Sequence, residues 1–195
     1  MSKLPLSARF KSHCEQWNGC TKCPLHENAH KKALHRGRLP ADILFIGEGP
    51  GKFEDYEGEP FVGPAGILLD QIIRDAHNHV LDTRPDLLDI RIGFTNVLAC
   101  MPIDGPLSEP REPSKAEALA CRPRLTELMA MSRPKGIVLV GKSANKFVPV
   151  DATKRLFIVH PAHILRIKEP TKQALAIKTC ILKVSQFMSL TVPKV

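Results

Sequence analysis

Residues 43–66 read ILFIGEGPGKFEDYEGEPFVGPAG, and this stretch decides the fold that the sequence predicts. Its first four residues, 43–46, form an apolar run typical of a buried strand. The apolar residues of 67–73 recur at helical spacing. We therefore expect a strand at about 42–46, then a long loop, then a helix from about Gly63 to Val80.

The loop after this strand has the composition of a ligand site. Gly47, Gly49 and Gly51 permit close approaches to the backbone that a side chain would prevent. The loop is not a phosphate-binding P-loop, because Phe53 stands where Ser or Thr is required, and it lacks the third glycine of the dinucleotide fingerprint. Its acidic residues also argue against bound phosphate; they are Glu48, Glu54, Asp55, Glu57 and Glu59.

The chain of 195 residues is long enough for one good core, and we expect 1–195 to be a single domain with 1–13 as a loosely attached lead-in. The formal net charge of +8 favours a polyanionic partner, with nucleic acid first, although a protein can also be basic without such a partner. The sequence has no apolar run of signal-peptide or membrane-spanning character. We expect a cytoplasmic protein with no membrane partner.

Four apolar runs are expected to be strands: about 42–46, 90–97, 136–140 and 155–159. A helix should begin at the Ser114 capping box and be kinked or restarted by Pro123, and a last helix should cover about 171–189. Strands that alternate with helices predict an α/β fold with a parallel sheet between helices. Ligands of such sheets bind beyond the carboxyl ends of the strands.

Polar residues follow the predicted strands at that edge of the sheet. Glu48, Asn96 and His160 stand at or just beyond the ends of three strands, and the remaining strand leads into Gly141 and Lys142. A single Asn or His is usually structural. Their joint placement predicts a functional site at the carboxyl edge.

The cysteines indicate a metal or redox site. Cys20 and Cys23 form a Cys-x-x-Cys pair, whose sulfurs both turn inward from one tight turn and suit either a metal or redox chemistry. Six cysteines in an unsecreted chain are typical of thiols or metal ligands rather than of a disulfide framework. The basic segment 26–38 that follows is interpreted as a solvated face, and its three histidines are not needed as ligands.

Taken together, these motifs resemble those of the iron–sulfur uracil-DNA glycosylases, the family-4 branch of the uracil-DNA glycosylase superfamily. The resemblance extends from Cys20 to about Arg166. The stretch 47–66 looks like the family motif GEAPG…PFVG.AG. The other matches are Thr95-Asn96-Val97 with Cys100-Met101-Pro102, similar to TNV..C.P, then Cys121-Arg122-Pro123, similar to C.P, and His160-Pro161-Ala162-His163-Ile164-Leu165-Arg166, similar to HPS..LR.

The resemblance implies a three-layer sandwich whose central four-stranded parallel sheet has the order 2-1-3-4. It also implies an enzyme of base-excision repair, which hydrolyses the N-glycosidic bond of uracil flipped out of DNA and leaves an abasic site. The DNA would be single- or double-stranded. We expect the protein to be a monomer and, in a bacterium or archaeon, to associate with the nucleoid.

The family assigns roles to residues of the predicted site. Phe61 would stack on the flipped uracil beside Gly49, and the amide of Asn96 would bind the uracil edge. A neutral His160 would stabilise the charge that grows on a uracil oxygen. Glu48 or Glu54 would position water or offset the positive charge of the sugar, and the sequence does not rank these two carboxylates.

DNA contacts are expected from the segment after His160. Ile164 and Leu165 suit a wedge that enters the base stack, while Arg166 and Lys142 contact the DNA backbone. The alternative is that Ile164 and Leu165 simply begin the core of the next helix.

The resemblance also implies a [4Fe–4S] cluster held by four thiolates. By position the ligands are Cys20, Cys23, Cys100 and Cys121. Zinc on the same cysteines is the physical alternative, because a tetrahedral set of sulfurs suits both. Cys14 and Cys180 are left over as free thiols, although Cys14 would be able to substitute for a ligand. We expect a structural cluster, because uracil removal transfers no electron.

Three departures from the family pattern bear on the function. Gly49 replaces Ala, Ala162 replaces Ser, and the proline-rich loop 102–113 is longer than usual. A related branch traps uracil through a histidine in this loop, but none lies between Cys100 and Cys121, so no covalent trap is expected. Two alternatives stay open: an iron–sulfur protein that recognises uracil or damage in DNA with little catalysis, and a glycosylase for another deaminated base such as hypoxanthine.

Overall fold

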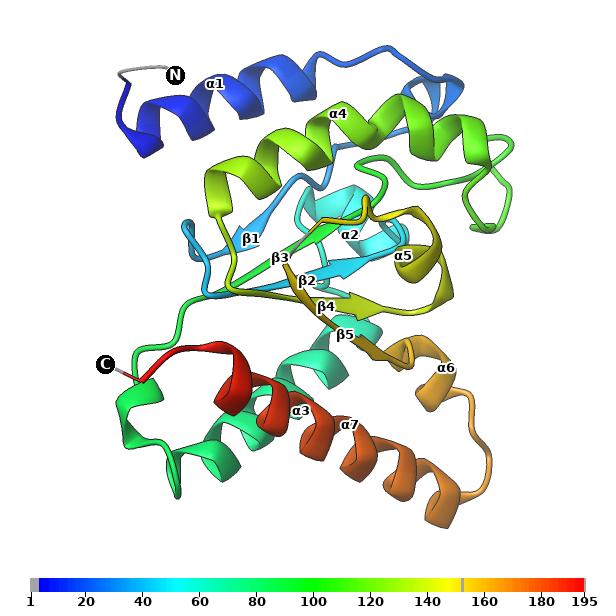
Figure 1. Cartoon of the computed structure of the whole chain (residues 1–195). Helices are drawn as coiled ribbons and strands as arrows, with labels where there is room; N and C mark the ends of the chain where they lie inside the picture. The colour runs from blue at the N-terminus through cyan, green and yellow to red at the C-terminus, as the bar shows by residue number, and fades with distance from the viewer. Residues whose placement is uncertain (1–3, 152, 195) are drawn as a thin grey trace.

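The computed structural model describes residues 4–151 and 153–194, which form a central sheet between helices (Figure 1). Among these residues the strands are β1 (Arg36–Gly37), β2 (Ile43–Gly47), β3 (Ile92–Asn96), β4 (Gly136–Val140) and β5 (Lys154–Ile158). Their order in the sheet is β1-β3-β2-β4-β5. The parallel strands β2 to β5 confirm the predicted order 2-1-3-4, and β1 adds a short antiparallel edge that was not predicted.

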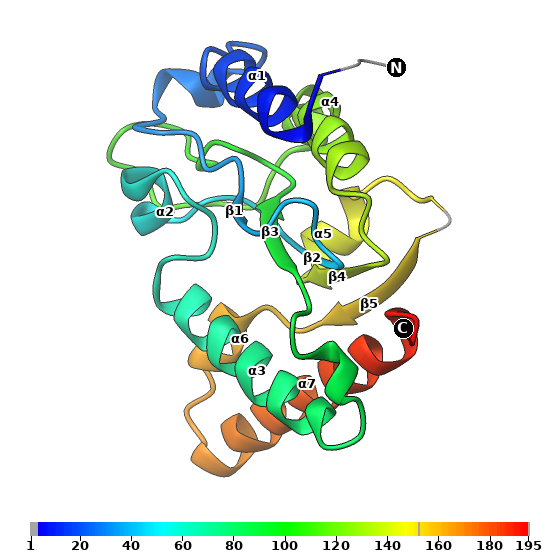
Figure 2. The same ribbon diagram turned by 90° about the vertical axis from the view of Figure 1, so that its left-hand side faces the viewer.

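The helices pack on both faces of this sheet. They are α1 (Leu6–Asn18), α2 (Lys52–Glu57), α3 (Pro64–Leu81), α4 (Lys115–Ser132), α5 (Lys142–Phe147), α6 (Pro161–Leu165) and α7 (Pro170–Thr191), with short 3₁₀ turns η1 (Pro24–Glu27) and η2 (Pro85–Leu87). In Figures 1 and 2, α3 and α7 lie below the sheet while α1 and α4 lie above it. None of the described helices is long and apolar enough to cross a membrane.

Strand β2 is buried on both faces, which explains its unbroken apolar sequence. Phe45 belongs to the core shared with α3 and α7, whereas Leu44 and Ile46 belong to the core shared with α4. Successive side chains of a strand point to opposite faces, so each face receives part of the run. The two cores hold the carboxyl end of β2, and hence Gly47, in a fixed place.

Helix α1 corrects the interpretation of residues 1–13 as a loosely attached lead-in. It packs against α4 and buries His13 and Trp17. The indole Nε1 of Trp17 donates to Oε2 of Glu127 on α4 at 2.7 Å, and Nδ1 of His13 lies 3.2 Å from the same oxygen. Residues 1–3 lie outside the described part of the chain.

Helices α2 and α4 correct two further predictions. The expected long loop contains α2. Pro123 does not interrupt α4, which runs without a break from its predicted Ser114 cap to Ser132. Proline in a helix interior costs about 3 kcal/mol. Burial of Leu125 and Met129 against the sheet supplies the opposing stabilisation.

The basic segment 26–38 is not simply a solvated face. Arg36 of β1 donates to both carboxylate oxygens of Asp70 on α3, at 3.0 and 2.8 Å. Its guanidinium also lies 4.0 Å from the centre of the Phe94 ring. These contacts fasten the antiparallel edge to the sheet.

Ile164 is a core residue and not a DNA wedge. Its side chain has 0% exposure and packs with the core of α3 and α7, whereas Leu165 is 46% exposed. A buried side chain cannot enter a base stack, so the prediction for Ile164 was wrong and its packing alternative holds. Leu165 lies on the surface and is not part of that core.

We predict that Ile164→Ala lowers the free energy of unfolding by about 2–5 kcal/mol, because it leaves a cavity in a packed core. Leu165→Ala is the matched control on the same helix and should change stability by less than about 0.5 kcal/mol. Denaturant unfolding of both variants measures the difference. Equal effects of the two substitutions would contradict this packing.

Candidate active site

One cleft opens beyond the carboxyl ends of the parallel strands, where the sequence predicts it. Glu48 follows β2, Asn96 ends β3, and His160 follows β5. The predicted site residues that line the cleft are Glu48, Gly49, Glu54, Phe61, Asn96, Lys142, His160 and Arg166. The structure therefore brings all of the predicted catalytic and uracil-binding residues together, from elements far apart in the chain.

The bare backbone of Gly47 permits two of these side chains to meet. A Cβ atom added at Gly47 would lie 2.5 Å from Cζ of Phe61 and would also collide with Oδ1 of Asn96. The amide N–H of Val97 donates to the carbonyl of Gly47 at 2.9 Å, which fastens the end of β3 to the end of β2. The Asn96 amide and the Phe61 ring therefore both lie in the space that a side chain at residue 47 would fill.

Phe61 is held in an unusual backbone conformation. Its φ is +59°, in the left-handed region that non-glycine residues rarely adopt. Gly66 at the start of α3 packs so close to the Phe61 carbonyl that any side chain there would collide with it. The ring is only 5% exposed, and its centroid lies 5.9 Å from that of Phe94 and 6.5 Å from that of His160. A rigid aromatic wall of this kind suits a planar ligand.

The hydrogen bonding of His160 determines which of its ring nitrogens donates. His160 is the N-cap of α6, and its Nδ1 accepts the backbone N–H of Ala162 at 3.2 Å. An accepting Nδ1 carries no proton, so in the neutral ring Nε2–H is the donor. Burial lowers the pKa of His160 below its usual value of 6.5, and the charge of Arg166 lowers it further. The ring is therefore a neutral donor at neutral pH.

Glu54 holds the loop together. Its two carboxylate oxygens accept the backbone N–H groups of Gly51, at 3.1 Å, and Gly63, at 2.9 Å. These bonds tie the start of α2 to the start of α3, across the segment that carries Phe61. These two hydrogen bonds give Glu54 a structural part in the loop.

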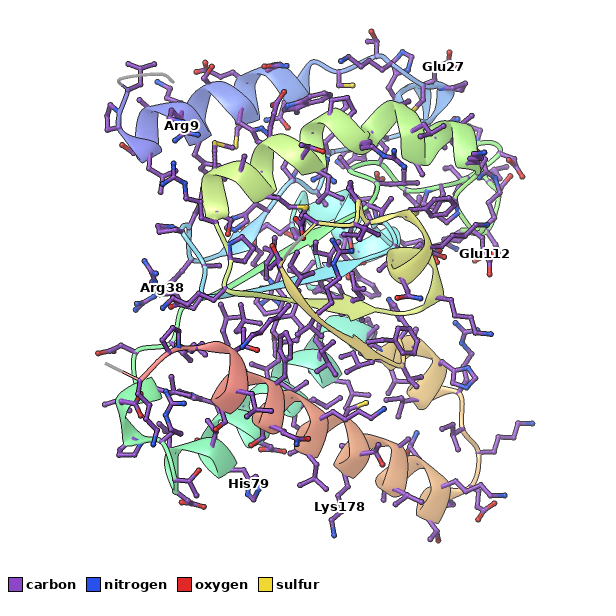
Figure 3. The ribbon with its side chains drawn as sticks, in the orientation of Figure 1. Arg9, Glu27, Arg38, His79, Glu112 and Lys178 are labelled. Atoms are coloured by element: carbon purple, nitrogen blue, oxygen red, sulfur yellow. The ribbon has the colours of Figure 1, made fainter. Side chains whose placement is uncertain are left out.

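Glu48 is the carboxylate with a perturbed acidity. Burial raises its pKa above the usual 4.5, a hydrogen bond with Ser143 opposes the rise, and the charge of Glu112 adds to it. Glu112 lies on the loop before α4 and is labelled in Figure 3. Ser143 and Glu112 both line the cleft, and the sequence patterns did not point to either.

The wall of the cleft beside β5 is basic and partly apolar. Lys142 and Arg166 are exposed there, and Arg166 Nε donates to the carbonyl of Ala162 at 3.1 Å. Phe157 and Val159 also line the cleft and are each 40% exposed. The sequence did not predict these two residues, because an apolar edge strand with one uncovered face has the same residue pattern as a fully buried strand.

A second cavity lies under α4 and gathers four of the six cysteines. Its walls include the predicted ligands Cys20, Cys23, Cys100 and Cys121. Burial raises the pKa of the Cys100 thiol to about 12, while the charge of Lys32 opposes that rise. Cys14 lies beside the cavity without lining it, and Cys180 lies in the core between α3 and α7.

The donor set of this cavity fits an anionic sulfur-ligated group. The four thiols come from four segments: Cys20 follows α1, Cys23 precedes η1, Cys100 follows β3, and Cys121 lies in α4. Three cationic side chains line the same cavity: Lys22, Lys32 and Arg124. Among the described residues, no three His, Cys, Asp or Glu side chains form a group that could hold a metal ion. The cysteines nevertheless face a common cavity, where positive charge would favour their thiolates.

Comparison with known proteins agrees with this geometry. The sequence model of the Uracil DNA glycosylase superfamily matches residues 34–181. Proteins named type-4 uracil-DNA glycosylase are similar: that of Sulfurisphaera tokodaii is 35% identical over 69% of this chain and 55% of its own length. That of Saccharolobus solfataricus is 36% identical over 66% and 54%, and that of Thermotoga maritima is 31% identical over 78% and 81%.

The fold, the cleft and these matches define the class: an α/β protein with the uracil-DNA glycosylase architecture. Within that superfamily, the chain belongs to the type-4 uracil-DNA glycosylase family. It spans about half the length of the first two relatives and four fifths of the Thermotoga protein.

We predict that Glu54→Gln lowers the free energy of unfolding by about 1–3 kcal/mol, because an amide cannot accept both backbone N–H groups. Glu48→Gln should leave stability unchanged or increase it, since burial disfavours the charged form of Glu48 at neutral pH. Thermal unfolding of the two matched variants at neutral pH measures this. A destabilised Glu48→Gln beside an unaffected Glu54→Gln would reverse the two roles.

Proposed function

We propose that this chain is a DNA repair glycosylase that hydrolyses the N-glycosidic bond of uracil flipped out of DNA, leaving an abasic site. The observation that carries the proposal is the meeting of Glu48, Phe61, Asn96 and His160 in one cleft. An aromatic wall, a bidentate amide, a neutral imidazole donor and a buried carboxylate supply what the excision of a pyrimidine needs. The partner is uracil-containing DNA.

The first step is capture of the extruded base. The target base must leave the stack to reach a cleft of this kind. Phe61 stacks on one face of the pyrimidine, since its ring is immobilised by Phe94 and by the backbone around Gly66. The amide of Asn96 offers one donor and one acceptor to the uracil edge. Cytosine presents the opposite pattern at that edge and is rejected.

The second step is cleavage of the bond between N1 of uracil and C1′ of the sugar. The electron pair leaves with uracil, which becomes an anion, and the sugar becomes cationic. Nε2–H of His160 donates to the uracil oxygen on which the negative charge grows. A neutral donor suits this role, because burial in the cleft disfavours the charged imidazolium and lowers the pKa of His160.

Glu48 acts on the sugar side. Its carboxylate offsets the positive charge of the sugar and accepts a proton from the water that attacks C1′. Glu54 supports this work by holding the loop, as its two hydrogen bonds indicate. Because the pKa of Glu48 is raised, the excision rate should fall with decreasing pH at values above the usual 4.5.

The DNA backbone is held by the basic wall of the cleft. Arg166 and Lys142 contact phosphate, and Leu165 lies on the adjacent surface. The net charge of +8 favours association with DNA in general. We propose that the chain acts as a monomeric single domain inside the cell.

Cys20, Cys23, Cys100 and Cys121 are proposed to hold a [4Fe–4S] cluster. Such a cluster cross-links the segments that supply its thiolates and so stabilises this side of the fold. The cations that line the cavity support the assignment, because a four-thiolate group is anionic. The alternative is zinc on the same thiolates, and metal analysis of the purified protein distinguishes zinc from iron.

We predict that His160→Ala and Asn96→Ala each lower the single-turnover rate of uracil excision by roughly 10²–10³-fold, the range for loss of one donor at a developing anion. Oligonucleotides that contain uracil or hypoxanthine, scored by strand cleavage at abasic sites, measure this. His79→Ala is the control, because His79 is exposed on α3 and does not line the cleft. Wild-type protein that binds uracil-DNA without excising it, or that excises only hypoxanthine, would overturn the proposal.

We predict a brown protein whose absorbance near ~400 nm arises from an iron–sulfur cluster. Cys20→Ser should lose iron and solubility together, because it removes a ligand from a group that links several segments. Cys14→Ser is the control and should retain iron, since Cys14 does not line the cavity. Stoichiometric zinc without iron in protein prepared anaerobically would contradict the cluster.

A further inference from the structure

Arg124 on α4 is completely buried, with 0% of its surface exposed. Arginine is almost never fully buried unless its charge is paired. Its Nη1 donates to Oγ1 of Thr95 at 2.9 Å and to the carbonyl of Leu34 at 3.3 Å. Its Nη2 donates to the carbonyl of Val97 at 3.1 Å and to that of Asn96. The guanidinium thus holds the carboxyl end of β3 from the side of α4.

Arg124 forms no ion pair or hydrogen bond with a carboxylate of the described residues. All of the hydrogen bonds of Arg124 go to carbonyl or hydroxyl oxygens, and its buried Nε has no partner there. Carbonyl dipoles solvate a cation, but an isolated charge in the interior remains costly. The burial of Arg124 therefore calls for an anion close by.

The cysteine cavity is where such an anion would lie. Arg124 lines that cavity together with Cys121, which precedes it by one turn on the same face of α4. A metal centre with four thiolate ligands carries net negative charge, whether it is an iron–sulfur cluster or zinc. Lys22 and Lys32 also line the cavity, but neither side chain is buried, whereas Arg124 is completely buried.

We propose that Arg124 is a positioning residue that joins the cysteine site to the base-reading site. Its charge is balanced by the anionic metal centre on one side, and on the other side its hydrogen bonds fix the backbone of Asn96. This inference rests on the proposed function and on the proposed four-cysteine cofactor. It gives the cofactor a specific part in the reaction: the metal centre stabilises the cation that holds Asn96 in place.

Two consequences follow for a protein without this cation. The metal centre loses a nearby positive charge, so its reduced form is destabilised and its reduction potential becomes more negative. The thiolates lose the same stabilisation, so chelators remove iron faster. Asn96 loses a backbone anchor, so the excision step slows while the affinity for DNA, which depends on the phosphate contacts, stays the same.

The experiment compares Arg124→Met, which removes the charge, with Arg124→Lys, which keeps the charge but not the planar set of donors. Arg122→Met is the matched control, because Arg122 is exposed on the same helix and does not line the cavity. Each full-length protein is assayed for iron content, for decay of absorbance near ~400 nm in excess chelator, for the midpoint potential, and for single-turnover excision at saturating and subsaturating uracil-DNA.

Arg124→Met should lose iron roughly 10–100-fold faster, the range for removal of an outer-shell partner of a metal site, and should show a more negative potential. Arg124→Lys should keep the wild-type rate of iron loss and the wild-type potential. At saturating DNA it should nevertheless excise uracil at least about tenfold more slowly, while the DNA concentration that gives half the maximal rate stays unchanged. Arg122→Met should match the wild type throughout. If Arg124→Met does not fold, the Arg124→Lys results decide the question.

The inference is overturned if Arg124→Lys excises at the wild-type rate, or if a folded Arg124→Met keeps its iron and potential unchanged. These results differ from failure of the proposed function. In that case the wild type itself would lack iron or would fail to excise uracil, before any variant is compared.

Discussion

The absence of a side chain at residue 47 is the constraint on which the candidate site depends. β2 ends at Gly47, and a Cβ there would collide with both the Phe61 ring and the Asn96 amide. The buried run 43–46 fixes that glycine at the carboxyl edge of the sheet, between two cores. The proposed base-stacking ring of Phe61 and the proposed base-reading amide of Asn96 therefore converge at one point of bare backbone, which only glycine provides.

Around this point the supporting contacts are rigid. Glu54 ties the two ends of the loop, Gly66 permits α3 to press against Phe61, and the cap of α6 fixes the ring of His160. Arg124 supports the Asn96 strand end from the side of the cysteine cavity. A transition state is stabilised most by groups that are already in place, and these contacts provide that preorganisation.

Much of this was predictable because the signals were local and redundant. The apolar runs gave the four parallel strands, and residues at the strand ends gave Glu48, Asn96 and His160 in one cleft. The order of the strands was predicted from the family resemblance.

The predicted role of Ile164 as a wedge was wrong. An apolar residue beside a basic one is equally typical of a DNA wedge and of a helix core, and only the packing of α6 distinguishes the two. The helical α1 and the continuous α4 were missed for a similar reason: their stability comes from tertiary contacts, such as that of Trp17 with Glu127 and the burial of Leu125.

The central claim is that the bare backbone of Gly47 permits uracil to be held and excised in this cleft. The most direct test is the single-turnover rate of uracil excision by Gly47→Ala, measured beside its iron content and far-ultraviolet circular dichroism. We predict a folded, iron-containing protein that has lost at least about 10²-fold in rate, because an active-site misplacement of about 1 Å costs that much. Excision at the wild-type rate by Gly47→Ala would contradict the account.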